Sequence, residues 1–175
     1  PSRSVDGASI VVLALPDKPD GVFRVLEVFN LHNCAWDHQA STIEDLTKKY
    51  DVAGIYIDRT GNGNGVYETV KQFYPAAVGL HYSVSVKNDL VLKAQQVIGN
   101  RRLAWDASHT RIAASFMKIR RALTQNSSQV TFVADRSADT GHADVAWAIM
   151  HALMHEGLLP PDGRPGCTVA FSEAA

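Results

Sequence analysis

The segment Val52–Asp58 constrains the fold more than any other part of the chain. Its alternating β-branched and aromatic residues are typical of a strand, and the apolar residues 55–57 indicate that this strand is buried. The strand ends on a single carboxylate, Asp58, and a loop rich in Gly and Asn follows at residues 61–65. Because ligands of open α/β sheets bind beyond the carboxyl ends of the strands, this segment predicts an α/β fold with a carboxylate at its functional edge.

Strand and helix patterns alternate along the rest of the chain. Two apolar segments, 10–15 and 22–29, flank a turn rich in Pro and Gly, which predicts an antiparallel hairpin. Further strands are expected at 76–82, 102–105 and 130–134, and helices at 37–50, 66–73, 87–98, 110–123 and 143–154. This order predicts the α/β class, with a mixed sheet, an antiparallel N-terminal hairpin and helices on both faces, and it resembles the ribonuclease H-like fold.

The segment after residue 158 contains several residues that interrupt regular structure, namely Pro160, Pro161, Gly163, Pro165 and Gly166. We therefore expect one domain over residues 1–158 and an extended or mobile C-terminal tail over residues 159–175. With 175 residues, of which 46% are hydrophobic and 20% charged, the chain is long enough for one domain with its own core.

Composition argues against several classes of protein. The sequence has no apolar stretch of about 18 residues, so no membrane span is expected, and its first residues, PSRSVDGAS, lack the pattern of a signal peptide. The two cysteines, Cys34 and Cys167, are expected to be free thiols, as in a reducing cytoplasm. The net charge of −1 gives no bulk attraction for nucleic acid, so a bound polyanion would have to be held by a local basic patch or by metal ions.

A second carboxylate, Asp144, opens the apolar helix pattern at 143–154. Each aspartate has a structural explanation, because Asp58 at a strand end can form a turn and Asp144 in a first helical turn interacts with the helix dipole. If both carboxylates meet in one pocket, their buried charges need compensation, which a divalent cation supplies. Asp6, before the first strand, is a third candidate ligand, although an acidic residue also suits a lead-in rich in Ser and Gly.

Other polar residues lie near the expected functional edge. Lys87 and Arg136 are candidates for phosphate contact, although most basic residues of this kind lie on a solvated helix face. His142, two residues before Asp144, could either lie near a phosphate or cap the helix. The loop at 61–65 lacks the Lys-Ser/Thr pair that ends a P-loop, so its glycines are expected to let the backbone turn sharply beside Asp58.

Several ordered motifs together resemble one protein family. They are Asp58, Val66-Tyr67, Phe73-Tyr74-Pro75-Ala76-Ala77, Lys87 with Val91-Leu92-Lys93-Ala94 and Val97-Ile98, and Arg136-Ser137 followed by His142-Ala143-Asp144-Val145-Ala146-Trp147. Between residues 1 and 158, this pattern is similar to the C-terminal nuclease domain of the terminase large (ATPase) subunit of tailed phages.

The resemblance implies a ribonuclease H-like endonuclease that uses two Mg²⁺ or Mn²⁺ ions to cut concatemeric double-stranded DNA during packaging in the host cytoplasm. It implies that Asp58 and Asp144 are catalytic, metal-binding carboxylates, with Asp6 as a candidate assisting ligand, and it leaves Lys87, Arg136 and His142 as the candidates for contact with DNA. In this family the first carboxylate directly precedes a Pro-Ser/Ala dipeptide. Here the chain opens with Pro1-Ser2, so that ligand is expected just upstream.

The same resemblance implies a packaging-motor setting, with an ATPase motor domain further upstream and the small terminase subunit and the portal as partners. Two alternatives remain open at this point. One is a ribonuclease H-like nuclease of the resolvase or integrase type. The other is a catalytically silent module that docks DNA or protein.

Overall fold

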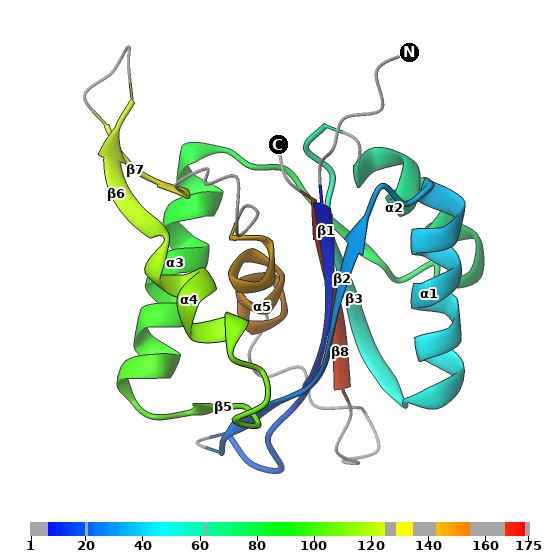
Figure 1. Ribbon diagram of the computed structural model, residues 1–175, viewed down its shortest axis with the longest axis horizontal. Helices are drawn as coiled ribbons and strands as arrows, with labels where there is room; N and C mark the ends of the chain where they lie inside the picture. The colour runs from blue at the N-terminus through cyan, green and yellow to red at the C-terminus, as the bar shows by residue number, and fades with distance from the viewer. Residues whose placement is uncertain are drawn as a thin grey trace.

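The computed structural model describes residues 7–19, 21–61, 63–124, 129–134, 143–154 and 167–173. Within these residues, a six-stranded sheet lies between two layers of helices (Figure 1). Its strand order is β4-β3-β8-β1-β2-β5. The strands are β1 (Gly7–Ala14), β2 (Phe23–His32), β3 (Val52–Asp58), β4 (Val78–Leu80), β5 (Leu103–Ala104) and β8 (Cys167–Glu173).

The sheet is mixed, as the sequence predicts. β1 pairs with β2 as an antiparallel hairpin, from Gly7 opposite His32 to Ala14 opposite Arg24. β8 is antiparallel to β1 but parallel to β3, and β3 is parallel to β4. The short β5 pairs parallel to β2 at the edge of the sheet. The prediction of an α/β fold with an N-terminal hairpin is therefore confirmed.

Helices cover both faces of the sheet (Figure 1). On one side lie α1 (Trp36–Lys49) and α2 (Gly63–Phe73); on the other lie α3 (Val84–Gly99), α4 (Arg111–Met117) and α5 (Asp144–Met154). Among the described residues, none of these helices has both the length and the apolar character needed to cross a lipid bilayer.

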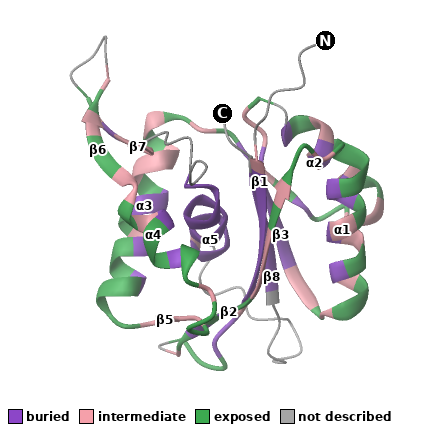
Figure 2. Ribbon diagram, viewed as in Figure 1, coloured by how far each residue is buried: buried purple, intermediate pink, exposed green. Residues whose placement is uncertain are grey.

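The alternation of side chains along β1 divides the core in two. Ile10 and Val12 pack into the cluster on the side of α1 and α2, whereas Val11 and Leu13 pack into the cluster on the side of α3 and α5. This follows from the two-residue period of a strand, which sends successive side chains to opposite faces. α5 lies between the sheet and the outer helices and is buried along almost its whole length (Figure 2).

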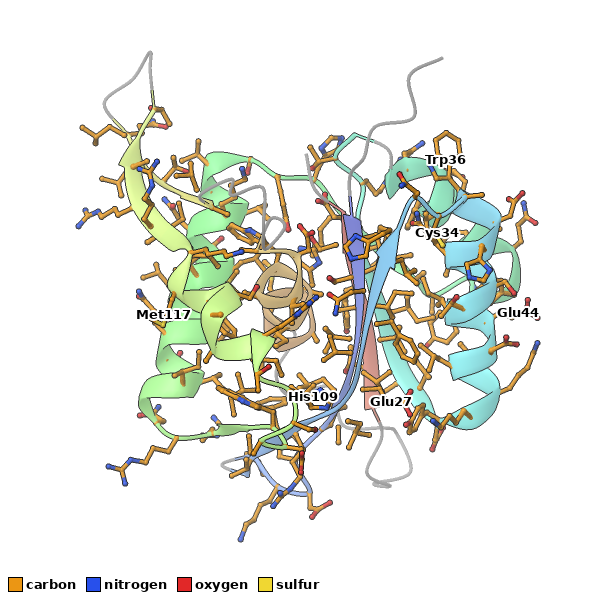
Figure 3. All side chains as sticks on the ribbon, in the orientation of Figure 1. Glu27, Cys34, Trp36, Glu44, His109 and Met117 are labelled. Atoms are coloured by element: carbon orange, nitrogen blue, oxygen red, sulfur yellow. The ribbon has the colours of Figure 1, made fainter. Side chains whose placement is uncertain are left out.

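Contacts at its two ends hold α1 in place, one with the sheet and one with α2. Glu27 of β2 lies near the C-terminal end of α1, where it accepts hydrogen bonds from Lys49 and, at 2.8 Å, from the Tyr50 hydroxyl (Figure 3). At the other end of α1, a Cβ on Gly65 of α2 would meet the Trp36 ring, so glycine permits this close approach. Nearby Cys34 is a free thiol, as predicted.

The prediction of a C-terminal tail over residues 159–175 is wrong for Cys167–Glu173. This segment forms β8, which lies between β3 and β1 in the middle of the sheet. Val169, Ala170 and Phe171 are fully buried there. The Pro and Gly residues that precede β8 suggested an unpaired tail, whereas the partners that order this strand are far away in the sequence.

The predicted helix at 110–123 is also wrong in its second half. α4 ends at Met117, and Ile119–Leu123 forms strand β6, which pairs antiparallel with β7 (Val130–Ala134). β6 and β7 make a separate two-stranded sheet, so the predicted strand at 130–134 is confirmed but does not join the main sheet. The apolar residues Ile119 and Leu123 continue the helical spacing of the sequence beyond the end of α4, which suggested a longer helix. In the structure Ile119 packs against the core, whereas Leu123 is largely exposed.

Candidate functional site

One edge of the sheet gathers the carboxyl ends of three parallel strands. β3 ends at Asp58, opposite Leu80 of β4, and in the preceding register position Ile57 lies opposite Phe171 of β8. α5, which begins with Asp144, packs against β8. The segment that joins β4 to α3 contributes Tyr82. In open α/β sheets this edge is where ligands bind.

Asp58 is fully buried although it is a carboxylate. Its Oδ1 accepts a hydrogen bond from the Thr60 backbone N–H at 2.8 Å, and the Thr60 hydroxyl also hydrogen-bonds the carboxylate. Burial raises the pKa of Asp58, while these hydrogen bonds and the nearby charges of Lys87 and His81 act in the opposite direction. Oδ2 is buried and has no hydrogen-bond partner among the described residues. A buried carboxyl oxygen of this kind is a candidate ligand for a cation.

Asp144 is the first residue of α5 and is also buried, with 7% of its surface exposed. Burial raises the pKa of the Tyr82 phenol well above its ordinary value, and the charges of both Asp58 and Asp144 raise it further. Both aspartates therefore lie within electrostatic range of one tyrosine. The two carboxylates that the sequence singled out, one from the end of β3 and one from the start of α5, thus act on the same side chain.

Tyr82 connects the elements that carry these aspartates. Its backbone N–H donates to Thr60 Oγ1 at 3.1 Å, and its hydroxyl lies 2.7 Å from His151 Nε2. Its hydroxyl also hydrogen-bonds Ser172 of β8. The ring packs against Trp147 of α5, with centroids 5.3 Å apart.

His151 lies seven residues after Asp144 on α5 and is fully buried. Its Nδ1 lies 3.1 Å from the Phe171 carbonyl oxygen, which can only accept, so Nδ1 carries the proton. Burial lowers the pKa of His151 to about 4, against the weaker effect of that hydrogen bond, so the ring is neutral near pH 7. Nε2 is consequently an acceptor, and the Tyr82 hydroxyl donates to it.

Lys87 of α3 is the described basic residue that the sequence assigned to phosphate contact. Its Nζ lies 5.3 Å from the centroid of the Tyr82 ring, and its charge lowers the pKa of Asp58. Lys87 therefore lies beside Tyr82 and within electrostatic range of Asp58, while its side chain stays partly exposed. Exposed His81 lies at the same edge of the site.

Three of the predicted site residues, Asp6, Arg136 and His142, lie outside the described residues. Within the part of the chain that the structure describes, no group of three or more His, Cys, Asp or Glu side chains is arranged to hold a metal ion. Among the described residues, Asp58 and Asp144 thus remain the candidate donors for a cation.

The Gly-Asn loop shapes the backbone beside Asp58. Gly61 has a φ of 70°, a conformation that favours glycine, and Gly63 begins α2. A Cβ on Gly63 would overlap the Asp58 carbonyl oxygen. The glycines therefore let α2 start directly against the end of β3, as the sequence predicts.

Sequence reasoning missed Thr60, Tyr82, His151 and Ser172. The one available signal was the seven-residue spacing of Asp144 and His151, which places both on the same face of α5. The Tyr82 hydroxyl and its partner His151 are 69 residues apart, so nothing local indicated their contact.

Comparison with known proteins gives a consistent result. Residues 1–156 match the family model of the Terminase RNaseH-like domain. The chain is 45% identical over 158 residues to the terminase ATPase subunit of Escherichia phage P2, and 37% identical over 159 residues to a probable terminase ATPase subunit of Haemophilus phage HP1. These matches cover 90% of this chain but only 27% and 26% of the two relatives, so the chain spans about a quarter of their length.

The fold is similar to solved nuclease domains. The large terminase nuclease of thermophilic phage G20c with bound magnesium superposes with a TM-score of 0.71, at 19% identity, covering 88% of this chain and 77% of that one. A cobalt-bound structure of the same nuclease gives a TM-score of 0.65 at 18% identity, with 83% and 74% covered. The large terminase nuclease domain of Thermus phage P74-26 gives 0.56 at 17% identity, with 82% and 77% covered.

Proposed function

Since the chain belongs to the family of terminase RNase H-like domains, we propose that it is a divalent-metal-dependent endodeoxyribonuclease that cuts concatemeric double-stranded DNA during phage genome packaging. One observation carries this proposal. Two buried aspartates from separate elements lie around Tyr82 at the ligand-binding edge of the sheet, and Asp58 Oδ2 has no hydrogen-bond partner among the described residues.

The residues fit a hard divalent cation. Mg²⁺ and Mn²⁺ prefer carboxylate oxygens, and a buried carboxylate oxygen without a donor costs free energy that a bound cation would offset. Asp58 and Asp144 would hold the ions, together with Asp6 or an upstream carboxylate. The magnesium- and cobalt-bound structures of the related nuclease support the use of divalent ions. A bound pair of such ions supplies the charge that activates a water and stabilises the leaving oxygen of an in-line phosphodiester displacement.

The residues of this chain set up that chemistry. Thr60 orients one oxygen of Asp58, which leaves Oδ2 for the ion. The N-terminal end of α5 presents Asp144 from the other side, and Lys87 offers a positive charge for the DNA backbone at the rim. Arg136 and His142 are further candidates for contact with DNA. Because the ions would offset the charge of the carboxylates, the domain does not need a basic excess, which agrees with its net charge of −1.

The proposed setting is the host cytoplasm, where the domain would act on double-stranded DNA. The relatives are terminase ATPase subunits, and this supports a connection to an ATPase motor domain. The small terminase subunit and the portal are the further partners that we propose on this basis.

The test is DNA cutting by the full-length protein that contains this domain. We expect Asp58→Asn and Asp144→Asn each to reduce plasmid nicking in Mn²⁺ below detection, because each removes a charged ligand from a buried site. Asp45→Asn is the matched control, since Asp45 is exposed on α1, on the opposite face of the sheet. It should cut like the parent protein.

The two alternatives predict different results. Unchanged nicking by either of the site variants would reject the role assigned to that aspartate. A resolvase would cut branched DNA in preference to linear duplex, and a silent docking module would neither cut DNA nor bind Mn²⁺ in calorimetry.

A further inference from the structure

Tyr82 lies where three elements of the candidate site meet. Its backbone N–H binds Thr60, which in turn holds Asp58, and its hydroxyl binds His151, which lies two turns along α5 from Asp144. One residue therefore connects the strand end that carries one aspartate to the helix that carries the other. We propose that Tyr82, with His151, is a positioning residue that sets the relative placement of Asp58 and Asp144 for ion binding. This inference rests on the proposed nuclease function.

The hydroxyl of Tyr82 forms hydrogen bonds with two side chains, those of His151 and Ser172. It donates to His151 Nε2 at 2.7 Å and also hydrogen-bonds Ser172, while the opposite nitrogen of His151 donates to the Phe171 carbonyl oxygen at 3.1 Å. The chain of hydrogen bonds thus begins and ends on two successive residues of β8. With its hydroxyl committed in this way, Tyr82 acts through its neighbours and does not itself bind the ion.

These contacts fix the rotation of α5 about its axis. Asp144 and His151 are seven residues apart, about two helical turns, so they lie on nearly the same face of the helix. A hydrogen bond that holds His151 against β8 therefore also turns Asp144 toward the sheet. The ring of Tyr82 also helps to fix this rotation, because it packs against Trp147, which lies between Asp144 and His151 on α5.

The ring of Tyr82 also faces the basic rim. Lys87 Nζ lies 5.3 Å from its centroid, within the range of a cation–π interaction. Replacing Tyr82 by Phe keeps this ring and its packing but removes the hydroxyl. Tyr82→Phe is thus a specific probe of the hydroxyl's bonds to His151 and Ser172, while the backbone bond to Thr60 is kept.

Tyr74→Phe is the matched control. The Tyr74 hydroxyl donates at 3.1 Å to the carbonyl oxygen of Val52, at the start of β3, whereas Asp58 is at its end. Both tyrosines are partly buried, and both hydroxyls join separate elements. Both variants lose one hydroxyl oxygen, Tyr74→Phe at the start of β3 and Tyr82→Phe between α5 and β8.

The experiment measures Mn²⁺ affinity by calorimetry and the Mn²⁺ concentration for half-maximal plasmid nicking, in the full-length protein. Residues that orient metal ligands typically contribute about 10–100-fold to metal affinity or activity. We expect Tyr82→Phe to weaken both quantities by at least about tenfold. Tyr74→Phe should leave both unchanged, even if it lowers the melting temperature.

A second pair of variants tests whether Tyr82 and His151 act as one unit. His151→Asn keeps a donor for the Phe171 carbonyl but removes the acceptor for the Tyr82 hydroxyl. The double variant should bind Mn²⁺ no more weakly than the weaker single variant, since residues in one hydrogen-bond network are not additive. Losses that multiply would overturn the shared role.

Asp58→Asn, measured in the same way, separates this inference from the proposed function. If Asp58→Asn loses Mn²⁺ binding while Tyr82→Phe binds like Tyr74→Phe, the positioning role is wrong and the nuclease proposal stands. If Asp58→Asn binds Mn²⁺ like the parent protein, the proposed function is itself wrong, and the inference falls with it.

Discussion

His151 is a titratable side chain that the fold holds entirely away from water. Its two nitrogens are both hydrogen-bonded, one to the Phe171 carbonyl and one to the Tyr82 hydroxyl. Protonation of Nε2 would bury a charge and would also replace an accepted hydrogen bond by two facing donors. The neutral ring is therefore required by both burial and hydrogen bonding.

The pKa of His151, lowered to about 4 from 6.5, predicts a loss of stability in acid. Below pH 6.5 His151 becomes protonated in the unfolded chain, whereas in the folded chain it stays neutral down to about pH 4. The free energy of unfolding therefore falls as pH falls through this window. Between pH 7 and pH 5 this residue should cost about 2 kcal/mol of unfolding free energy, at 1.36 kcal/mol for each pH unit below 6.5. Urea unfolding of the ion-free protein at several pH values measures it.

The comparison that isolates His151 uses His151→Gln, which cannot take up the proton. Although this variant will be less stable at pH 7, its stability should fall about 2 kcal/mol less than that of the parent protein between pH 7 and pH 5. His38→Gln is the control, because His38 is exposed on α1 and meets water in both states. Equal pH dependence in the parent protein and His151→Gln would show that His151 is not held neutral.

At the same scale, the sequence predicted the position of the aspartates but not their surroundings. Asp58 and Asp144 could be found because each follows a local pattern, the end of an apolar strand and the start of an apolar helix. The contact of Tyr82 with His151 depends on how a loop and a helix pack in three dimensions, which no local period records. Side chains that position a ligand through such contacts are accordingly the ones that sequence reasoning missed.

At the scale of elements, the strongest periodic patterns gave the right result. The buried strand β3 and the apolar helix α5 were both expected, and their ends carry the candidate site. The errors fell on β6 and β8, two strands whose identity depends on their partners. The residues of β6 kept a helical spacing beyond Met117, and only pairing with β7 made them a strand.

The central place of β8 leads to a prediction about truncation. A chain that ends at residue 158, where the sequence suggested a domain boundary, would lack the strand that pairs with both β1 and β3. It would lose the burial of Val169 and Phe171, each worth about 1.5–3 kcal/mol. It would also remove one of the two neighbours of both β1 and β3 and so divide the sheet between them, a large loss against a total stability of about 5–15 kcal/mol.

We therefore expect the chain that ends at residue 158 to show no cooperative thermal transition by circular dichroism. A chain that ends at Glu173, the last residue of β8, is the control and should melt like the parent protein. If the shorter chain unfolds cooperatively near the same temperature, β8 is not needed for the core.

At the scale of the whole molecule, the net charge of the chain differs from the local charge at the candidate site. The chain carries 17 basic and 18 acidic residues, so its overall field neither attracts nor repels DNA strongly. The two carboxylates that we propose as metal ligands, Asp58 and Asp144, are buried away from bulk solvent. Binding of divalent ions would reverse the sign of the charge at this edge, which is the change that a polyanionic substrate requires.

We propose that a third ligand joins Asp58 and Asp144 at the candidate site. The described residues supply two carboxylates, and the family pattern expects a further one just before Pro1, with Asp6 as an assisting ligand. Adding about ten upstream residues, enough to complete a strand of typical length, should therefore tighten Mn²⁺ binding. We expect a gain of at least about tenfold in Mn²⁺ affinity, because each added carboxylate contributes both a ligand and a charge.

A calorimetric titration of the 175-residue chain against the extended chain measures the difference. Asp6→Asn in each chain identifies the ligand: if the extension adds nothing and Asp6→Asn abolishes binding in both chains, Asp6 is the first ligand and the expected upstream carboxylate has no role.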